Sequence, residues 1–158
     1  MKKLITTIFL MTLVSASYGQ GLIYLRCDLD ARPIITIVVL DIENFKWDYM
    51  DLPRPQNESW KASEYQAILD GSFDEDSRIT SITSDRFWLQ AYEGAILEDY
   101  RLDRISGEMI RRNTLDPDEW ALFRKCLPST KLEADNLLQE RIDLRSEMIR
   151  RNEAKRLF

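Results

Sequence analysis

Two neighbouring runs of residues decide the fold: Ile34-Ile-Thr-Ile-Val-Val-Leu40 and Asn44-Phe-Lys-Trp-Asp-Tyr-Met50. The first run is β-branched at every position but its last, which is typical of a buried strand. In the second run apolar and polar residues alternate, so its three aromatic side chains are expected on one face of a strand. Residues 41–44 form the turn between the two runs. The stretch therefore predicts a β-hairpin.

Similar short runs occur on both sides of this hairpin. Strand candidates are residues 22–27 before it and residues 65–69, 79–82, 87–92, 97–105 and 108–111 after it. The segments between them are mostly short and contain Gly, Asp or Ser, as turns do. Seven or eight such strands predict a mainly β fold, a small antiparallel meander that closes as a barrel or a sandwich. For residues 64–69 a single helical turn is the alternative.

The periodicity becomes helical towards the C-terminus. Asp116 and Pro117 are typical of a helix start. They predict a short helix that carries Trp120 and Phe123 and ends at Pro128. Such a helix would bring the second cysteine back to the first strand.

A longer α-helix is predicted from Ser129 or Thr130, either of which can cap it, almost to the end of the chain. Its apolar residues are expected on one broad side; they are Leu132, Ala134, Leu137, Leu138, Ile142, Leu144, Met148 and Ile149. Arg141 and Arg145 fall in the middle of that side, where a fully buried face would not place two guanidinium groups. Residues 129–158 are therefore predicted to be an amphipathic helical extension, either a loosely docked arm or a surface for a partner.

Residues 1–19 have the three parts of a secretory signal peptide, which are a basic start, an apolar stretch and small residues before the cut. We expect cleavage before Gln20, with cuts after Ala16 or Ser17 as alternatives. A membrane anchor is the competing interpretation, but the eleven residues 4–14 are too short to span about 30 Å of hydrocarbon. The sequence thus predicts a periplasmic or secreted protein with no stable transmembrane segment after cleavage.

Export makes the two cysteines informative, because an even number of cysteines in an oxidising compartment is typical of a disulfide. Cys27 and Cys126 bracket the strand-rich region and are expected to pair, which gives a disulfide-closed β domain over residues 20–128. Closing so long a loop stabilises a fold by up to about 4.7 kcal/mol in the chain-entropy model. Two free buried thiols are the alternative.

The composition excludes several kinds of chemistry. The chain has no His and only 2 Cys, which excludes Ser-His and Cys-His triads and a zinc site of four cysteines. No Gly-rich loop precedes a helix, so no nucleotide site is predicted. After cleavage the chain has 20 basic and 27 acidic residues, a net charge of −7 that disfavours binding to nucleic acid. We predict no cofactor and no metal.

Two groups of carboxylates have a functional alternative. Residues 70–76 are rich in Asp and Glu, but their spacing does not match the calcium loop of an EF-hand, so a solvated acidic turn is preferred. Asp99 and Asp103 are expected on one strand face with Arg101 between them. A glycosidase needs one carboxyl group of raised pKa, whereas a neighbouring Arg lowers it. We therefore predict ion-paired surface carboxylates and no catalytic residue.

Most aromatic residues are expected in the core, because a small barrel needs large side chains inside. Two tryptophans are the candidates for an exposed binding surface. Trp60 lies in a Pro-rich loop, and Trp88 follows Phe87 in a strand, so its side chain is expected on the opposite face. They and the acidic charge predict a non-catalytic module that binds a basic protein or a small ligand. Two alternatives remain, a small carboxylate-dependent hydrolase and an envelope structural protein that self-associates through residues 130–157.

The chain resembles a group of small exported bacterial proteins of uncharacterised function through three features: Tyr24-Leu-Arg-Cys27, the hairpin Leu102-Asp-Arg-Ile-Ser-Gly107 and the late Cys126. This resemblance implies a compact β domain over residues 22–126 and supplies no activity. In the hairpin, Gly107 is expected to have a positive φ. A weaker likeness is to periplasmic inhibitors of C-type lysozyme, which are disulfide-bonded β-barrels with an acidic surface. Their Ser-Gly-x-x-Tyr loop is not present, because Glu-Met-Ile follows Gly107.

Overall fold

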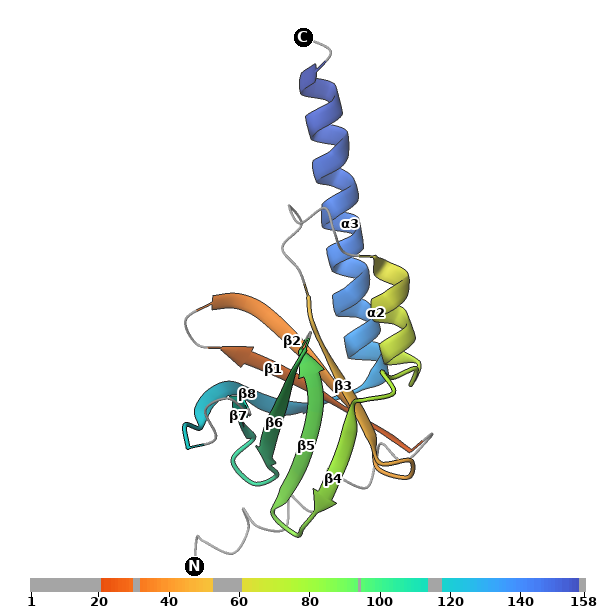
Figure 1. Cartoon of the computed structure of the whole chain (residues 1–158). Coiled ribbons are helices and arrows are strands. Elements are labelled where there is room, and N and C mark those ends of the chain that lie inside the picture. The colour runs from red at the N-terminus through yellow and green to blue at the C-terminus, as the bar shows by residue number, and fades with distance from the viewer. Residues whose placement is uncertain (1–20, 30–31, 53–60, 94, 114–117, 157–158) are drawn as a thin grey trace, which may run out of the picture.

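The computed structural model describes residues 21–29, 32–52, 61–93, 95–113 and 118–156. Within them eight strands, each antiparallel to the next, follow one another around a closed barrel in chain order (Figure 1). The strands are β1 (Leu22–Leu29), β2 (Arg32–Asp41), β3 (Lys46–Asp51), β4 (Arg78–Ile82), β5 (Arg86–Glu93), β6 (Ile96–Asp103), β7 (Glu108–Asn113) and β8 (Ala121–Ser129). The helices are α2 (Ala62–Leu69) and α3 (Lys131–Arg156). The predicted antiparallel meander with a C-terminal helix is confirmed, and it closes as a barrel.

The barrel closes because β1 is bonded on both sides. It pairs with β2 and with β8, and Cys27 lies opposite Cys126 in the second of these pairings. The two sulfur atoms form the predicted disulfide, and the Cα atoms of this pair are 3.9 Å apart. The disulfide therefore joins the first strand to the last, and the alternative of two free thiols is wrong.

The predicted short helix before Cys126 is wrong, because residues 121–129 form strand β8. β8 has a paired neighbour on each side, β1 and β7, and its residues Phe123 and Cys126 are buried in the barrel. Hydrogen bonds along both edges outweigh the local preference for a helix. Asp116 and Pro117, which suggested the helix, lie outside the described residues.

Residues 62–69 form α2, so the helical alternative for residues 64–69 is right and the strand is wrong. The spacing of Tyr65, Ile68 and Leu69 corresponds to one face of a helix, and these side chains pack together on the outside of the barrel. The main-chain carbonyl of Leu69 accepts a hydrogen bond of 2.8 Å from the Tyr24 hydroxyl. This bond fixes the end of α2 against β1.

The turn between β2 and β3 includes Phe45, which the alternation had placed in the strand. Phe45 has a φ of 54° and its side chain is largely exposed. Trp47 and Tyr49 do share the inner face of β3, as predicted, and pack in the barrel core. The expected row of three aromatic side chains is therefore a row of two.

The unbroken apolar run of β2 is explained by burial on both of its faces. Val38 and Leu40 point into the barrel core, whereas Ile37 and Val39 belong to a second core on the outside. In that second core α2 and the first turns of α3 cover the outer face of β1, β2 and β3 (Figure 1). This part of the barrel wall is the middle layer of three.

Helix α3 begins with a capping box. The main-chain N–H of Glu133 donates to the Thr130 hydroxyl at 3.2 Å, and the Glu133 carboxylate accepts a 2.9 Å hydrogen bond from the Thr130 N–H. The bond from the Thr130 N–H, with bonds from the Ser129 and Thr130 hydroxyls to the same carboxylate, lowers the pKa of Glu133. Thr130 is thus the cap, one of the two predicted.

Only the first turns of α3 are packed. Ala134 and Leu138 are buried against the barrel, whereas Leu144 and Ile149 are exposed on a helix about 39 Å long that continues away from it (Figure 1). Leu132, predicted on the apolar side, is 69% exposed, because it lies across the helix from Ala134 and Leu138. Among the described residues, no helix is both long and apolar enough to cross a lipid bilayer.

Candidate binding sites

The middle of the barrel is filled by aromatic side chains. Trp47, Tyr49, Tyr100 and Phe123 contact one another with ring centroids between 5.0 and 5.9 Å apart. Burial raises the pKa of the Tyr100 hydroxyl, and the neighbouring Tyr49 and the carboxylate of Glu98, which accepts its hydrogen bond, raise it further. These aromatic residues form the core, so recognition of any large partner has to use the outside of the barrel.

A cleft of about 450 Å³ opens in the wall of the barrel where β3 and β4 separate. These two strands share one register pair, Lys46↔Arg78, whereas β2 and β3 share six. The cleft is lined by Asp48, Tyr49, Met50 and Asp51 of β3, by Glu64, Tyr65 and Ile68 of α2, by Asp74 and Ser77, and by Ala91 and Tyr92 of β5. Four of these lining residues are acidic, three are tyrosines and none is basic. We call this site the acidic cleft.

Two of the four carboxylates in the acidic cleft are already paired. Glu64 forms an ion pair of 2.9 Å with Lys61, and Asp51 forms one of 3.2 Å with Arg124. Neither Asp48 nor Asp74 forms an ion pair with a basic side chain in the part of the chain that the structure describes. The acidic cleft therefore keeps a surplus of negative charge.

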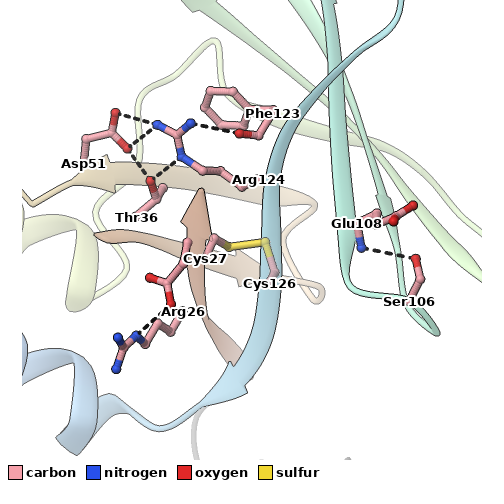
Figure 2. Close-up of a disulfide and its surroundings, with 10 residues drawn as sticks. Arg26, Cys27, Thr36, Asp51, Ser106, Glu108, Phe123, Arg124 and Cys126 are labelled. Atoms are coloured by element: carbon pink, nitrogen blue, oxygen red, sulfur yellow. Dashed lines mark hydrogen bonds and ion pairs between the residues drawn. A yellow bond between two sulfur atoms is a disulfide. The ribbon is translucent and has the colours of Figure 1, made fainter. Parts of the chain in front are cut away.

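Arg124 holds Asp51 from inside the protein (Figure 2). The buried guanidinium donates to the Thr36 hydroxyl at 2.8 Å, to the Phe123 carbonyl at 2.8 Å and to both Asp51 oxygens at 3.2 and 3.3 Å. The Thr36 hydroxyl also donates to Asp51. This network crosses from β8 to β2 and β3 and orients Asp51 at the edge of the cleft.

Asp48 has the most unusual environment of the cleft carboxylates. Burial raises its pKa. The negative charge of Asp74 adds a smaller effect in the same direction, which a main-chain hydrogen bond from Asp74 opposes more strongly. A 2.8 Å hydrogen bond from the Tyr49 N–H opposes the shift. Burial likewise raises the pKa of the Tyr65 hydroxyl, with smaller contributions from Asp51 and Glu64. A cation placed here would relieve the desolvation and repulsion that Asp48 experiences.

The acidic turn at one side of the cleft is held by Lys46. Its ammonium group donates to the main-chain carbonyls of Asp74 and Glu75, at 3.4 and 2.6 Å. The Asp74 carboxylate accepts a 3.0 Å hydrogen bond from the Asp76 N–H. No group of acidic or sulfur side chains in the described ranges is arranged to hold a metal ion. This turn positions Asp74 at the cleft.

Trp88, a predicted binding residue, lies on the outer barrel face and is half-buried. Its ring meets that of Trp120 edge to face, with centroids 6.2 Å apart, and the Arg101 guanidinium lies 5.6 and 5.2 Å from the two rings. Arg112 lies 4.6 Å from the Trp120 ring and forms an ion pair of 3.1 Å with Asp99. Trp88 is therefore part of an ordered cluster of two Trp and two Arg, and is less exposed than predicted.

The other predicted binding residues are not brought to the acidic cleft. Arg141 and Arg145 are half-buried on α3, on either side of Ile142, which packs against the outer core. Trp60 lies outside the described residues. Sequence reasoning missed Asp48 and Tyr65, because a cleft whose lining comes from β3, α2 and β5 has no signature within any single segment.

The carboxylates considered for hydrolysis are engaged in structural contacts. Asp99 is bonded to Arg112 and accepts a 2.8 Å hydrogen bond from Gln90. The N–H groups of Ser106 and Ile105 lower the pKa of Asp103, and Arg86 contributes to this shift. These contacts are those predicted for ion-paired surface carboxylates, and the lowered pKa of Asp103 is the opposite of what a general acid needs.

Comparison with known proteins gave no relatives. No protein-family model, no curated protein and no solved structure matches this chain.

Proposed function

We propose that this chain is an exported, non-catalytic binding module whose acidic cleft takes a cationic group of a partner. The observation that carries the proposal is the cleft of about 450 Å³ lined by four carboxylates and three tyrosines and by no basic side chain. Within the described residues, neither the Asp48 nor the Asp74 carboxylate forms an ion pair, and the Lys46 ammonium bonds the main-chain carbonyls of Asp74 and Glu75. A Lys or Arg side chain of a basic protein has the chemistry that fits this lining.

Two physical effects favour a cation in such a cleft. Carboxylates in a cleft with low-dielectric walls focus the negative potential and raise the rate of encounter with a basic partner. The faces of Tyr49, Tyr65 and Tyr92 carry negative quadrupole potential, which attracts ammonium and guanidinium groups. Both effects act on charge and not on reaction chemistry, so they support binding and supply no catalytic step.

Export is supported by the disulfide between β1 and β8. Disulfides persist in oxidising compartments and are rare in the cytosol. Cys27 and Cys126 are fully paired and almost completely buried. The basic, apolar and small-residue pattern of residues 1–19 gives independent support, although those residues lie outside the described part.

The proposal is tested by calorimetric titration with a capped tri-arginine peptide at low and high salt. We expect binding at low salt, weakening as salt screens the cleft. The double variant Asp48→Asn, Asp74→Asn should weaken this binding about tenfold, because two carboxylates are lost. A capped tri-glutamine peptide of equal length should not bind.

The matched control is Asp118→Asn with Glu119→Gln, which removes two exposed carboxylates outside the cleft. Equal loss of affinity in both double variants would reject the acidic cleft as the site. C-type lysozyme is a suitable first basic protein for the same titration, in view of the weaker sequence likeness to its inhibitors.

Self-association through residues 130–157 is a second candidate, favoured by the exposed Leu144 and Ile149 on the unpacked part of α3. If it occurs, sedimentation of the full chain shows a mass above that of the monomer. The double variant Leu144→Glu, Ile149→Glu should restore the monomer. Leu132→Glu, at an exposed leucine in the first turn of α3, should have no effect.

A further inference from the structure

A second, smaller cavity lies at one mouth of the barrel, away from the acidic cleft. It measures about 130 Å³, and its apolar lining includes Ile23 and Leu25 of β1, Leu40 of β2, Phe87 of β5 and Leu102 of β6. Leu40, Phe87 and Leu102 are buried, whereas Ile23 and Leu25 are inward-facing and only partly buried. The aromatic core therefore stops short of this mouth and leaves apolar surface facing a void.

The rim of this mouth cavity carries a fixed cation. Arg104 lies in the turn after β6, and its guanidinium is 5.0 Å from the centroid of the Phe87 ring. One guanidinium nitrogen donates to the Thr83 carbonyl at 3.0 Å, and the Arg104 main-chain N–H donates to Asp85 at 2.7 Å. Among the described residues, Thr83 is the one acceptor bonded to this guanidinium, so most of its five donors are left for a ligand.

The neighbouring carboxylate of Asp103 also lines the cavity, but among the described residues it forms no ion pair with Arg104. It accepts hydrogen bonds of 2.9 and 2.8 Å from the N–H groups of Ile105 and Ser106, and Arg86 lies 3.9 Å away. The Asp103 carboxylate is thus engaged by the N–H groups of its own turn and by Arg86. The rim offers an anion-binding side chain directly beside an apolar void.

We infer that the mouth cavity is a binding site for a small carboxylate with an apolar body. Its hydrocarbon part fills the space among Ile23, Leu25, Leu40, Phe87 and Leu102, and its carboxylate accepts hydrogen bonds from Arg104. This inference does not depend on the proposed function of the acidic cleft, because the two sites share no lining residue.

The volume restricts the body of the ligand to about one aromatic ring or a short branched alkyl group. Apolar cavities of about 150 Å³ in proteins stay dry and take up benzene. A guanidinium pairs with a carboxylate through two parallel hydrogen bonds, which gives orientation as well as affinity. Phenylacetate combines both features and is the probe we choose, with toluene as its uncharged analogue and acetate as the anion without a body.

The test is an NMR titration of the full chain that follows the methyl groups of Ile23, Leu25 and Leu40. We expect phenylacetate to shift these methyl signals at lower concentration than toluene, and acetate to leave them unchanged. Absence of a methyl shift with both phenylacetate and toluene would overturn the inference.

Three variants separate the parts of the site. Arg104→Gln should weaken phenylacetate binding about tenfold and leave toluene binding unchanged, because only the anion uses the guanidinium. Arg78→Gln, at an exposed arginine of β4 outside the lining, is the matched control and should change neither. Ile23→Phe, which fills the partly exposed side of the cavity, should abolish both. Equal effects of Arg104→Gln and Arg78→Gln on phenylacetate would overturn the assignment, and neither variant removes a core side chain.

Discussion

The Cα of Gly107 lies so close to β8 that a Cβ there would be 2.1 Å from the main-chain carbonyl oxygen of Cys126. The two residues are also linked by a 2.7 Å hydrogen bond from the Cys126 N–H to the Gly107 carbonyl. Gly107 has a φ of +73°, as the hairpin motif predicted. The turn after β6 is thus packed directly against the strand that carries the disulfide.

Gly107→Ala should therefore destabilise the fold by more than about 2 kcal/mol, because it combines a left-handed conformation with a clash against backbone. Gly71→Ala is the matched control. Gly71 has a φ of +86°, but its added Cβ would meet only the flexible side chain of Leu22, at 3.2 Å. Urea unfolding with the disulfide intact measures both changes. Equal losses would show that the contact with Cys126 costs nothing beyond the strain in φ.

Removing the disulfide with Cys27→Ala and Cys126→Ala should cost about 2–5 kcal/mol, because the bond closes a loop between residues 99 positions apart. Denaturant titration of the variant beside the parent chain gives the difference. Since Cys27 is fully buried, the folded parent chain should also resist alkylation after mild reductant treatment. Rapid alkylation without denaturant would contradict this burial.

Much of the fold was predictable because its signals are local. The apolar run of residues 34–40 matches burial on both faces of β2, and the cap at Thr130 matches the capping box that begins α3. β8 was not predictable from its own residues, because its conformation depends on pairing with β1 and β7. Hydrogen bonding along both edges of a strand can outweigh the helix preference that a preceding Asp-Pro pair indicates.

The sites were harder to predict than the fold. The acidic cleft exists because β3 and β4 share a single register pair, and no sequence pattern states that two neighbouring strands will separate. The alternation of faces along the strand correctly predicted that Trp88 lies on the outer face. It could not predict that Arg101 and Trp120 lie against the Trp88 ring. Contacts between strands decide both features.

The pH dependence of stability should reveal Asp48. Burial raises its pKa in the folded chain above the ordinary value of 3.8. Between the two values the folded state keeps a proton that the unfolded chain releases, so stability falls as pH rises through that window. Asp48→Asn should therefore stabilise the chain at neutral pH and give no such gain below about pH 3. Urea unfolding at both pH values tests this, with Asp118→Asn as the control. A larger gain at acid pH would contradict it.

The capping box should contribute measurably to α3. Thr130→Ala removes the hydroxyl that accepts the Glu133 N–H and should cost about 1 kcal/mol. Thr130→Ser keeps the hydroxyl and should cost much less. Thermal unfolding followed by circular dichroism compares the two variants. If they are equally stable, the packing of Ala134 and Leu138 holds the helix without its cap.

Arg124 couples the stability of the barrel to the charge of the acidic cleft, and one substitution should change both. Arg124→Met leaves Asp51 without its ion pair and should cost about 2–4 kcal/mol, because the partners of a buried guanidinium are left unsatisfied. The same change adds an uncompensated carboxylate to the cleft, so the tri-arginine peptide should bind about threefold more tightly at low salt. Arg124→Lys keeps the charge but loses the planar fork, and should lower stability less and leave peptide affinity unchanged. Unfolding and calorimetry on the same preparations separate the two effects. If the Arg124→Met variant binds the tri-arginine peptide with unchanged affinity, Asp51 lies too far from the bound cation to attract it.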